Sequence, residues 1–204
     1  MNLLTVNGLV SVDDVRWADG HAYAWIKSPK GEVPQSRLEL DYYAAILAEL
    51  TDFHAAVATA LVDCQPGGCG RDGNLLRKLV QATELQITAM TGFHQRNFCT
   101  ATSALWSTSA LTAAASFIKE FTIWYVREGG TGRATTIWEG YQGTISGWNQ
   151  TLMEAAAVAC IKTVAAIRFH TEQESKVEAL MPLFADCGGG ANSVYIFHVD
   201  KRPN

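Results

Sequence analysis

The chain has 204 residues, of which 48% are hydrophobic and 18% charged, so it can bury a sizeable core and lacks the composition of a disordered protein. Its net charge is −4, with lysine and arginine scattered along the sequence, which argues against a nucleic-acid partner. No apolar run approaches the roughly 20 residues that span a bilayer, and no signal peptide is visible. Together with five cysteines that form no Cys-x-x-Cys pair, these features predict a cytoplasmic protein with reduced thiols and no membrane partner.

In chain order, short apolar runs alternate with stretches of helical spacing. The strand-like runs cover residues 24–26, 54–64 (a strand with its approach), 85–90, 135–138, 164–169 and 193–197. The stretches of helical spacing cover residues 74–83, 110–126, 151–163 and 175–184. Strands that alternate with helices of this length indicate βαβ units and a parallel sheet, and the continuously apolar runs indicate a sheet covered on both faces.

The length of the chain limits how many such units it can hold. A complete TIM-type barrel of eight strand–helix units typically needs ~250 residues, or about 31 per unit. At that rate 204 residues hold about six units, in agreement with the number of strand-like runs. We therefore expect residues 1–204 to form a single α/β domain, an incomplete barrel of parallel strands.

Two histidines close apolar runs in the same way, His170 after Ala-Ala-Ile-Arg-Phe and His198 after Ser-Val-Tyr-Ile-Phe. They lie 198 − 170 = 28 residues apart, about one strand–helix–strand step, so both are expected at the carboxyl ends of neighbouring strands, where such barrels collect metal ligands. Each histidine is followed two positions later by an acid, Glu172 or Asp200. The alternation of side chains along a strand puts each acid on the same side as its histidine, where it can orient the imidazole or bind substrate. His21, just before an apolar run, offers a third imidazole. Imidazoles and carboxylates suit zinc. A structural role explains each histidine better when it is taken alone, and only three histidines at strand ends in one α/β pattern make metal binding an equally good interpretation.

Three further features are interpreted as structural. His54 precedes a strand-like run and is expected at the opposite end of the barrel, whereas His94 follows one and is expected to support the site or the fold without binding metal. The glycine-rich residues 67–72 (GGCGRD) lack the order of a phosphate-binding loop. They are interpreted as a tight turn with Arg71 and Asp72 at the start of a helix.

Four words of the sequence together resemble the phosphotriesterase-like family of the amidohydrolase superfamily. They are LVDCQPGGCGRD at 61–72, TGFH at 91–94, FHTE at 169–172 and HVDKRP at 198–203, and the likeness runs from near residue 5 to the last residue. The resemblance implies a distorted (β/α)8 barrel with two divalent metals, usually zinc. It also implies that a metal-activated water is the nucleophile and attacks a phosphotriester, a lactone or a related ester.

The resemblance also assigns metal ligands. His21 matches the first histidine of a His-x-His pair on the first strand, His170 the histidine of the fifth strand and His198 that of the sixth. Tyr23 stands where the second histidine of the pair belongs, and Trp138 stands where the family has a carboxylated lysine that bridges the metals. Tryptophan cannot replace that lysine, because its indole is only a hydrogen-bond donor. The seventh and eighth strands of the family, with its aspartate ligand, have no counterpart, so three of six ligands remain.

These observations leave two main functional hypotheses open. The first is a zinc-dependent hydrolase of small-molecule esters with one metal or partial occupancy, in which no side chain is assigned as catalytic and Glu172, Asp200, Tyr23 and Trp138 support the site or the substrate. The second is a catalytically impaired barrel fragment that keeps partial metal binding or acts through a partner. Open sheet edges favour a homo-oligomer or a complementing chain. A third reading is an altered copy without an independent role.

Overall fold

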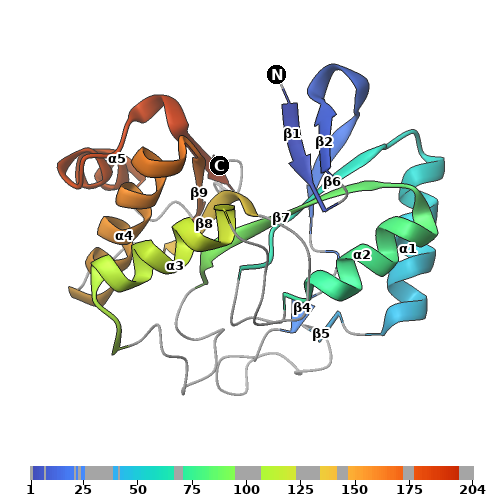
Figure 1. Cartoon of the computed structure of the whole chain (residues 1–204), viewed down its shortest axis with the longest axis horizontal. Coiled ribbons are helices and arrows are strands. Elements are labelled where there is room, and N and C mark those ends of the chain that lie inside the picture. Colours follow the sequence, from blue (N-terminus) through green and yellow to red (C-terminus); the bar gives the residue numbers. More distant parts are fainter. Residues whose placement is uncertain are drawn as a thin grey trace, which may run out of the picture.

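The strands of the chain form one main parallel sheet. The computed structural model describes residues 2–6, 8–20, 22, 24–25, 39–40, 42–66, 71–94, 107–122, 134–141, 147–171 and 177–197. Within these residues six strands are hydrogen-bonded in the order β10-β9-β8-β7-β6-β3, and every neighbouring pair is parallel (Figure 1). The strands are β3 (Trp17–Gly20), β6 (Ala60–Asp63), β7 (Gln86–Phe93), β8 (Ala134–Tyr141), β9 (Ala166–Thr171) and β10 (Val194–Phe197).

A helix lies between each pair of consecutive strands of this sheet. The helices are α1 (Tyr43–Ala55), α2 (Gly73–Thr83), α3 (Ala110–Thr122), α4 (Gly147–Thr163) and α5 (Val177–Asp186). In Figure 1, α1 and α2 flank one half of the sheet, and α3, α4 and α5 flank the other half. This succession confirms the predicted α/β fold with parallel strands.

The first strand of the sheet differs from the prediction. We expected residues 24–26 to form it, but β4 (Ala24–Trp25) pairs with β5 (Glu39–Leu40) in a separate two-stranded sheet. The strand in the main sheet is β3, which has the sequence Trp-Ala-Asp-Gly and therefore shows no apolar run. Parallel backbone pairing with β6 holds it in place. As a result, His21 follows the first strand in the chain instead of preceding it.

An N-terminal hairpin was not predicted. It consists of β1 (Asn2–Thr5) and β2 (Gly8–Ser11), which pair antiparallel. The backbone N–H of Val6, in the turn between them, donates to the carbonyl of Ile87 in β7 at 2.8 Å. The hairpin is therefore attached to the middle of the main sheet and not only to its neighbours in sequence.

The helix α1 was also missed. Residues 54–64 were expected to be a strand with its approach, but α1 extends to Ala55 and β6 begins only at Ala60. Of the thirteen residues in α1, only Ile46 and Leu50 are buried. A helix that buries so little carries a weak hydrophobic period, which explains why the sequence pattern did not reveal it.

The remaining predicted elements are present, with ends shifted by a few residues. Helix α2 begins one residue earlier than expected, α4 begins at Gly147 instead of at residue 151, and β7 continues to Phe93 instead of ending at residue 90. Residues 123–126 and 175–176, which were expected to be helical, lie outside the described part of the chain.

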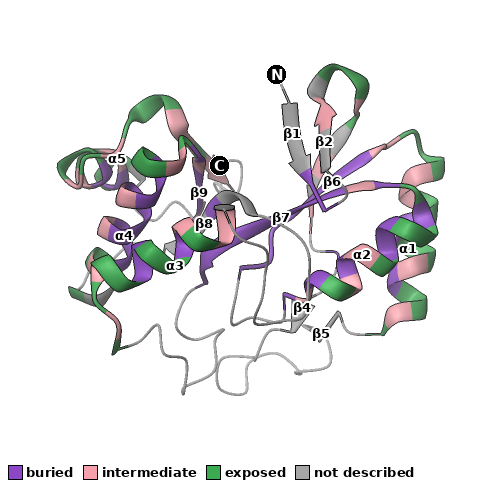
Figure 2. Ribbon diagram, viewed as in Figure 1, coloured by how far each residue is buried: buried purple, intermediate pink, exposed green. Residues whose placement is uncertain are grey.

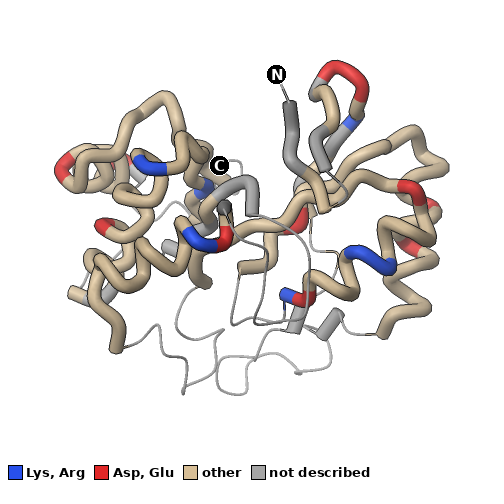
Figure 3. Tube along the Cα trace, in the orientation of Figure 1, with Lys and Arg blue, Asp and Glu red and all other residues tan. Residues whose placement is uncertain are grey.

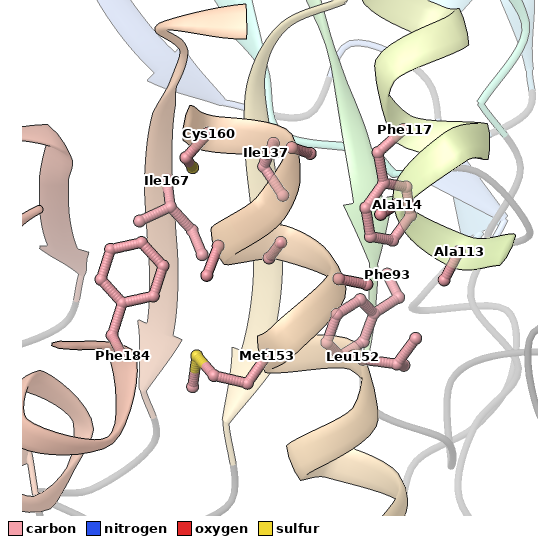
Figure 4. Close-up of a cluster of buried hydrophobic side chains, with 14 of the residues drawn as sticks. Phe93, Ala113, Ala114, Phe117, Ile137, Leu152, Met153, Cys160, Ile167 and Phe184 are labelled. Carbon is pink, nitrogen blue, oxygen red and sulfur yellow. The ribbon is translucent and has the colours of Figure 1, made fainter. Parts of the chain in front are cut away.

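The helices pack on one face of the sheet through two hydrophobic clusters. In the first, Phe93 of β7 stacks with Phe117 of α3 at a ring distance of 6.4 Å, and Phe169 of β9 meets Phe184 of α5 edge to face at 5.7 Å. Figure 4 shows side chains of β7, β8 and β9 converging on α4 in this cluster. The second cluster joins α1 and α2 to β6 and β7. Buried residues accordingly follow the strands and the sheet-facing sides of the helices (Figure 2).

The opposite face of the sheet carries a third, smaller cluster, and its members show that the sheet is curved. Val62 of β6, Cys64 and Met90 of β7 are buried there, and Phe197 of β10 packs against them. In a flat sheet β10 and β7 would be three strand spacings apart, about 14 Å, too far for these side chains to meet. The sheet therefore curls towards this face. Within the described residues it does not close, and β3 and β10 are its edges.

Charged residues lie mainly on the helices and in the segment between β2 and β3, and few lie on the central strands (Figure 3). Asp63 and Arg168 are on central strands and are buried. Cys64, Cys160 and Cys187 take part in no disulfide. Among the described helices, none is both long and apolar enough to cross a membrane.

The residue after α4 gives a test of the backbone geometry. Val164 has φ of 56° and is 89% exposed, and a non-glycine residue in the left-handed region costs about 1–2 kcal/mol. We expect Val164→Gly to raise the free energy of unfolding by about 1 kcal/mol, because glycine adopts this conformation without strain. Urea unfolding followed by circular dichroism measures the change. The matched control Val158→Gly, inside α4, should lower the stability by at least about 1 kcal/mol. A less stable Val164→Gly protein would contradict the prediction.

Candidate functional site at the carboxyl ends of the strands

Two histidines meet at the carboxyl edge of the sheet. His94 directly follows β7 and His170 is the penultimate residue of β9. Phe93 and Phe169, which precede them, are buried against the helices, so the alternation of side chains along a strand directs both histidines to the other face. Their ring centroids are 5.7 Å apart with an angle of 49° between the planes. His94 is buried and His170 half-buried.

This arrangement places His170 at the end of a strand and brings His94 beside it. His170 lies at the end of a buried strand, as its sequence pattern predicted. His94 was interpreted as a supporting residue, and its contact with the ring of His170 is compatible with that role. The signal that singled out His170, a histidine that ends an apolar run, is also present in the word Thr-Gly-Phe-His. His54 forms a hydrogen bond through Nδ1 with the carbonyl of Ala58, at 2.8 Å. It lies near the start of β6, at the opposite end of the strands from His170, as expected.

The other predicted site residues fall largely outside the described part of the chain. These are His21, Tyr23, Glu172, His198 and Asp200. The described strands end immediately before three of them in the sequence, at the last residues of β3, β9 and β10, and parallel strands share one carboxyl edge. Their roles stay predictions.

Trp138 lies inside β8, and only its strand position is described. Its Cα partners are Gly92 in β7 and Arg168 in β9. His170 pairs with Gly140, two residues further along β8. The position that the resemblance assigns to a bridging lysine is therefore one strand repeat below His170, and its role also stays a prediction.

Asp63 is a further residue of this edge, and sequence reasoning missed it. It ends β6, is fully buried, and its Oδ1 accepts a hydrogen bond from the backbone N–H of Ala22 at 2.9 Å. Ala22 is the residue between His21 and Tyr23, so this bond anchors the centre of the predicted ligand segment to the neighbouring strand. The signal was available, because Asp63 follows an apolar run as the histidines do.

Arg168 brings a buried positive charge to the same face. It precedes His170 by two residues, about 6.6 Å along a strand. Its guanidinium lies over the rings of Tyr195 and Phe197 in β10, with 5.5 Å and 5.4 Å to their centroids. Such cation–π contacts hold the charge in place. A fixed guanidinium below the histidines favours negatively charged groups at this edge of the sheet.

A second buried arginine fixes the end of β7 from the helix side. Arg71 forms an ion pair with Glu120 of α3 at 2.9 Å and donates to the carbonyl of Met90 at 2.5 Å. The hydroxyl of Thr91 also donates to Glu120. Asp72, as expected, caps the start of α2 through the backbone N–H groups of its second and third residues. The ion pair therefore holds the strand that leads into His94 against α3.

The donor set on the described strands is partly suited to a metal ion. No group of three or more His, Cys, Asp or Glu residues able to hold a metal is found among the residues that the structure describes. His94 and His170 are nevertheless two imidazoles at contact distance, and imidazole is a preferred ligand of zinc and related cations. The two residues fit a metal as a partial ligand set.

Comparison with known proteins identifies one family. The sequence model of the phosphotriesterase family matches residues 1–204. None of the curated protein sequences compared with the chain matches it.

Two solved structures have a similar fold. A lactonase from Listeria monocytogenes superposes with a TM-score of 0.85 and 18% identity, over 98% of this chain and 66% of its own. The phosphotriesterase homology protein from Escherichia coli, solved with phosphate in its active site, gives a TM-score of 0.76 and 21% identity, over 89% of this chain and 61% of its own. At these identities the likeness shows the shared fold. The chain spans less than two thirds of the length of either protein.

The ion pair beneath β7 gives a test of how this edge is held. Replacing Glu120 by Gln removes the carboxylate partner of Arg71, whose side chain is 2% exposed, and breaking a buried pair from one side costs about 3–5 kcal/mol. We expect Glu120→Gln to lose about 3 kcal/mol in urea unfolding at neutral pH. The double variant Arg71→Met, Glu120→Leu should recover most of it, because no buried charge remains.

The matched control is Glu154→Gln in α4. Glu154 accepts an exposed hydrogen bond from Gln150, and a surface change of this kind stays within about 0.5 kcal/mol. Equal stability of the Glu120 and Glu154 variants would show that the ion pair does not hold β7 against α3.

Proposed function

Since the chain belongs to the phosphotriesterase family, we propose that it is a metal-dependent hydrolase of ester-type bonds in small molecules. The observation that carries the proposal is the position of His170 at the carboxyl end of β9, on the face turned away from the helices. A family ligand is expected at this place. The proposed fold of the whole protein is the family's (β/α)8 barrel, of which the described sheet would form six consecutive strands.

The proposed metal is divalent, with zinc as the first choice and one ion or partial occupancy expected. Of the family ligands, His21, His170 and His198 are present in the sequence, whereas Tyr23 and Trp138 replace two others. A bound divalent ion supplies Lewis acidity and lowers the pKa of water, so that a nucleophile is available near neutral pH.

The residues of the chain would contribute positioning and charge. His170 presents its imidazole from a strand whose neighbouring side chain, Phe169, is locked against α5. Asp63 anchors the segment of His21 through Ala22. Arg168, buried on the same face of β9, favours the negative charge that develops on an ester oxygen during attack by water. Glu172 and Asp200 are proposed to orient the histidines or to contact substrate.

The proposed substrates are a phosphotriester, a lactone or a related ester. One structural neighbour is named as a lactonase and the other as a phosphotriesterase homologue with bound phosphate. Both reactions pass through an oxyanion after attack of water, so the same positive edge serves either one. In barrels of this type specificity lies largely in the loops after the strands, so both substrate classes belong to the proposal.

A second candidate function is favoured by the altered ligands and the open sheet. With Tyr23 and Trp138 in ligand positions, the protein would be an impaired barrel that keeps partial metal binding or works through a partner. Both β3 and β10 have one neighbour each among the described strands, and such edges pair readily with further strands. A second copy or a complementing chain is the proposed partner. A cytoplasmic location remains part of the proposal.

Metal content and turnover test the first proposal directly. Elemental analysis of the purified protein should find at most about one zinc ion per chain. The protein should hydrolyse an ester, a lactone or a phosphotriester slowly. Addition of zinc should raise this rate, and removal of the metal by a chelator should abolish it. His170→Asn should lower both zinc content and turnover by at least about tenfold. The control His54→Gln, at the other end of the strands, should change neither.

Two outcomes would contradict this reading. Two tightly held zinc ions with rapid turnover would show that Tyr23 and Trp138 do not impair the site. Bound zinc without turnover of any of the three substrates would overturn the hydrolase and support the second candidate function.

Restoring the family ligands gives an independent prediction. The double variant Tyr23→His, Trp138→Lys should raise the zinc content towards two equivalents and increase turnover, because it supplies the second imidazole and a lysine that can be carboxylated. The control Ile161→His adds an imidazole on the exposed surface of α4, near the opposite ends of the strands, and should leave the zinc content unchanged. Unchanged zinc content in the double variant would contradict the assignment of positions 23 and 138.

A further inference from the structure

The contact between His94 and His170 is closer than their strands alone would give. His94 follows β7 and His170 lies in β9, with β8 between them. Two strands separated by a third are about 9.6 Å apart, whereas the ring centroids are 5.7 Å apart. The two imidazoles therefore lean towards each other across β8.

The sequence of β8 makes this approach possible. Phe93 pairs with Glu139, so the next residues along the two strands, His94 and Gly140, lie at the same level, and Gly140 also pairs with His170. Glycine has no side chain to stand between the two rings. The central strand thus carries no side chain at the one level where both neighbouring strands carry histidine.

The separation of the rings matches that of two imidazoles on one metal ion. A Zn–N bond of about 2.0–2.1 Å and about 1.15 Å from nitrogen to ring centre place each centroid about 3.2 Å from the ion. Ligand angles of about 109–120° then give centroids about 5.2–5.6 Å apart, against the observed 5.7 Å. The rings can rotate about the metal–nitrogen bonds, so the angle of 49° between them is compatible with such a site.

Both rings are held by their neighbours in the chain. Phe93 is stacked on Phe117 and Phe169 is packed edge to face on Phe184, which fixes the backbone from which each histidine projects. The guanidinium of Arg168 lies over the rings of β10, so it is directed to the neighbouring strand. Preorganised imidazoles lose little side-chain entropy when they bind an ion.

We propose that His94 is a metal ligand, and that the imidazoles of His94 and His170 bind the same divalent transition-metal ion. His94 would then supply a metal-binding nitrogen in a chain that has Trp138 where the family has its metal-bridging lysine. The inference rests on the proposed function only in assuming that the bound ion takes part in hydrolysis. The binding of the ion is tested separately from catalysis.

The experiment uses the full chain, stripped of metal and titrated with Co²⁺ and then with competing Zn²⁺. The wild type should show the visible ligand-field bands of cobalt in a low-symmetry site, and both His94→Gln and His170→Gln should weaken Co²⁺ binding at least about 100-fold, beyond the effect typical of groups that only orient a ligand. His54→Gln is the matched control and should bind as the wild type does.

A donor replacement distinguishes ligation from packing. In His94→Cys a ligating thiolate would add a near-ultraviolet thiolate-to-cobalt charge-transfer band, which a residue that merely packs against His170 would not produce. The wild type alone provides a further measurement, because Cu²⁺ with ascorbate oxidises histidines that bind it. Peptide mass spectrometry should find 2-oxohistidine at positions 94 and 170 and not at position 54, even if the variants fold poorly.

The outcomes separate the inference from the proposed function. Cobalt binding that is equal in the wild type and His94→Gln, or a His94→Cys protein that binds cobalt without the charge-transfer band, overturns the role of His94 and leaves the hydrolase proposal standing. Binding that needs both histidines, without hydrolysis of any ester tested, supports the inference and overturns the hydrolase. Absence of Co²⁺ and Zn²⁺ binding in the wild type overturns both.

Discussion

The burial of two phenylalanines against the helices determines on which face of the sheet the two histidines of the candidate site lie. Phe93 and Phe169 belong to the largest hydrophobic cluster, and each is followed directly by a histidine. Because successive side chains of a strand point to opposite faces, every interaction that keeps the two rings under α3, α4 and α5 also keeps His94 and His170 on the other face. Removal of a phenylalanine from such a core costs about 3–5 kcal/mol, and a register slip that moves the histidines would have to expose both rings.

The curvature of the sheet is the second constraint, and it depends on few side chains. Phe197 reaches the cluster of Val62, Cys64 and Met90 across the concave face, where Arg168 lies over the same phenylalanine ring. Apolar side chains thus fill part of this face up to Phe197, which pairs with His170 at the carboxyl ends of the strands, where the polar groups collect. The same curvature brings the strand ends closer together, which an ion that binds residues from several strands requires.

The sequence predicted the strand–helix alternation well and the N-terminal third poorly, for a physical reason. The helix α2 buries apolar side chains along one face, whereas β7, β9 and α4 are largely apolar runs, buried along most of the two strands and in the middle of the helix, so spacing identifies the first and composition the others. The strand β3, with the sequence Trp-Ala-Asp-Gly, is held by backbone pairing to β6, and α1 buries two residues. Neither leaves a hydrophobic pattern. In the candidate site, the strand-end position of His170 was predicted because it ends a long apolar run, whereas the contact of His94 with His170 crosses Gly140 in another strand, a relation that spacing along the chain does not contain.

The tryptophan at position 138 and the proximity of the His94 and His170 rings both bear on how many metal ions the proposed site would hold. A bridging ligand from β8 holds two ions together, and an indole cannot take that role, because it has no acceptor atom. Without a bridge, two divalent ions would repel each other at short range with little compensation. The proposed single ion, held by the imidazoles of His94 and His170 across Gly140 of the intervening strand, would avoid that repulsion. Under the proposed function, tryptophan in the bridging position would therefore favour chemistry by one ion, and the fixed charge of Arg168 would give part of the stabilisation that a second ion provides.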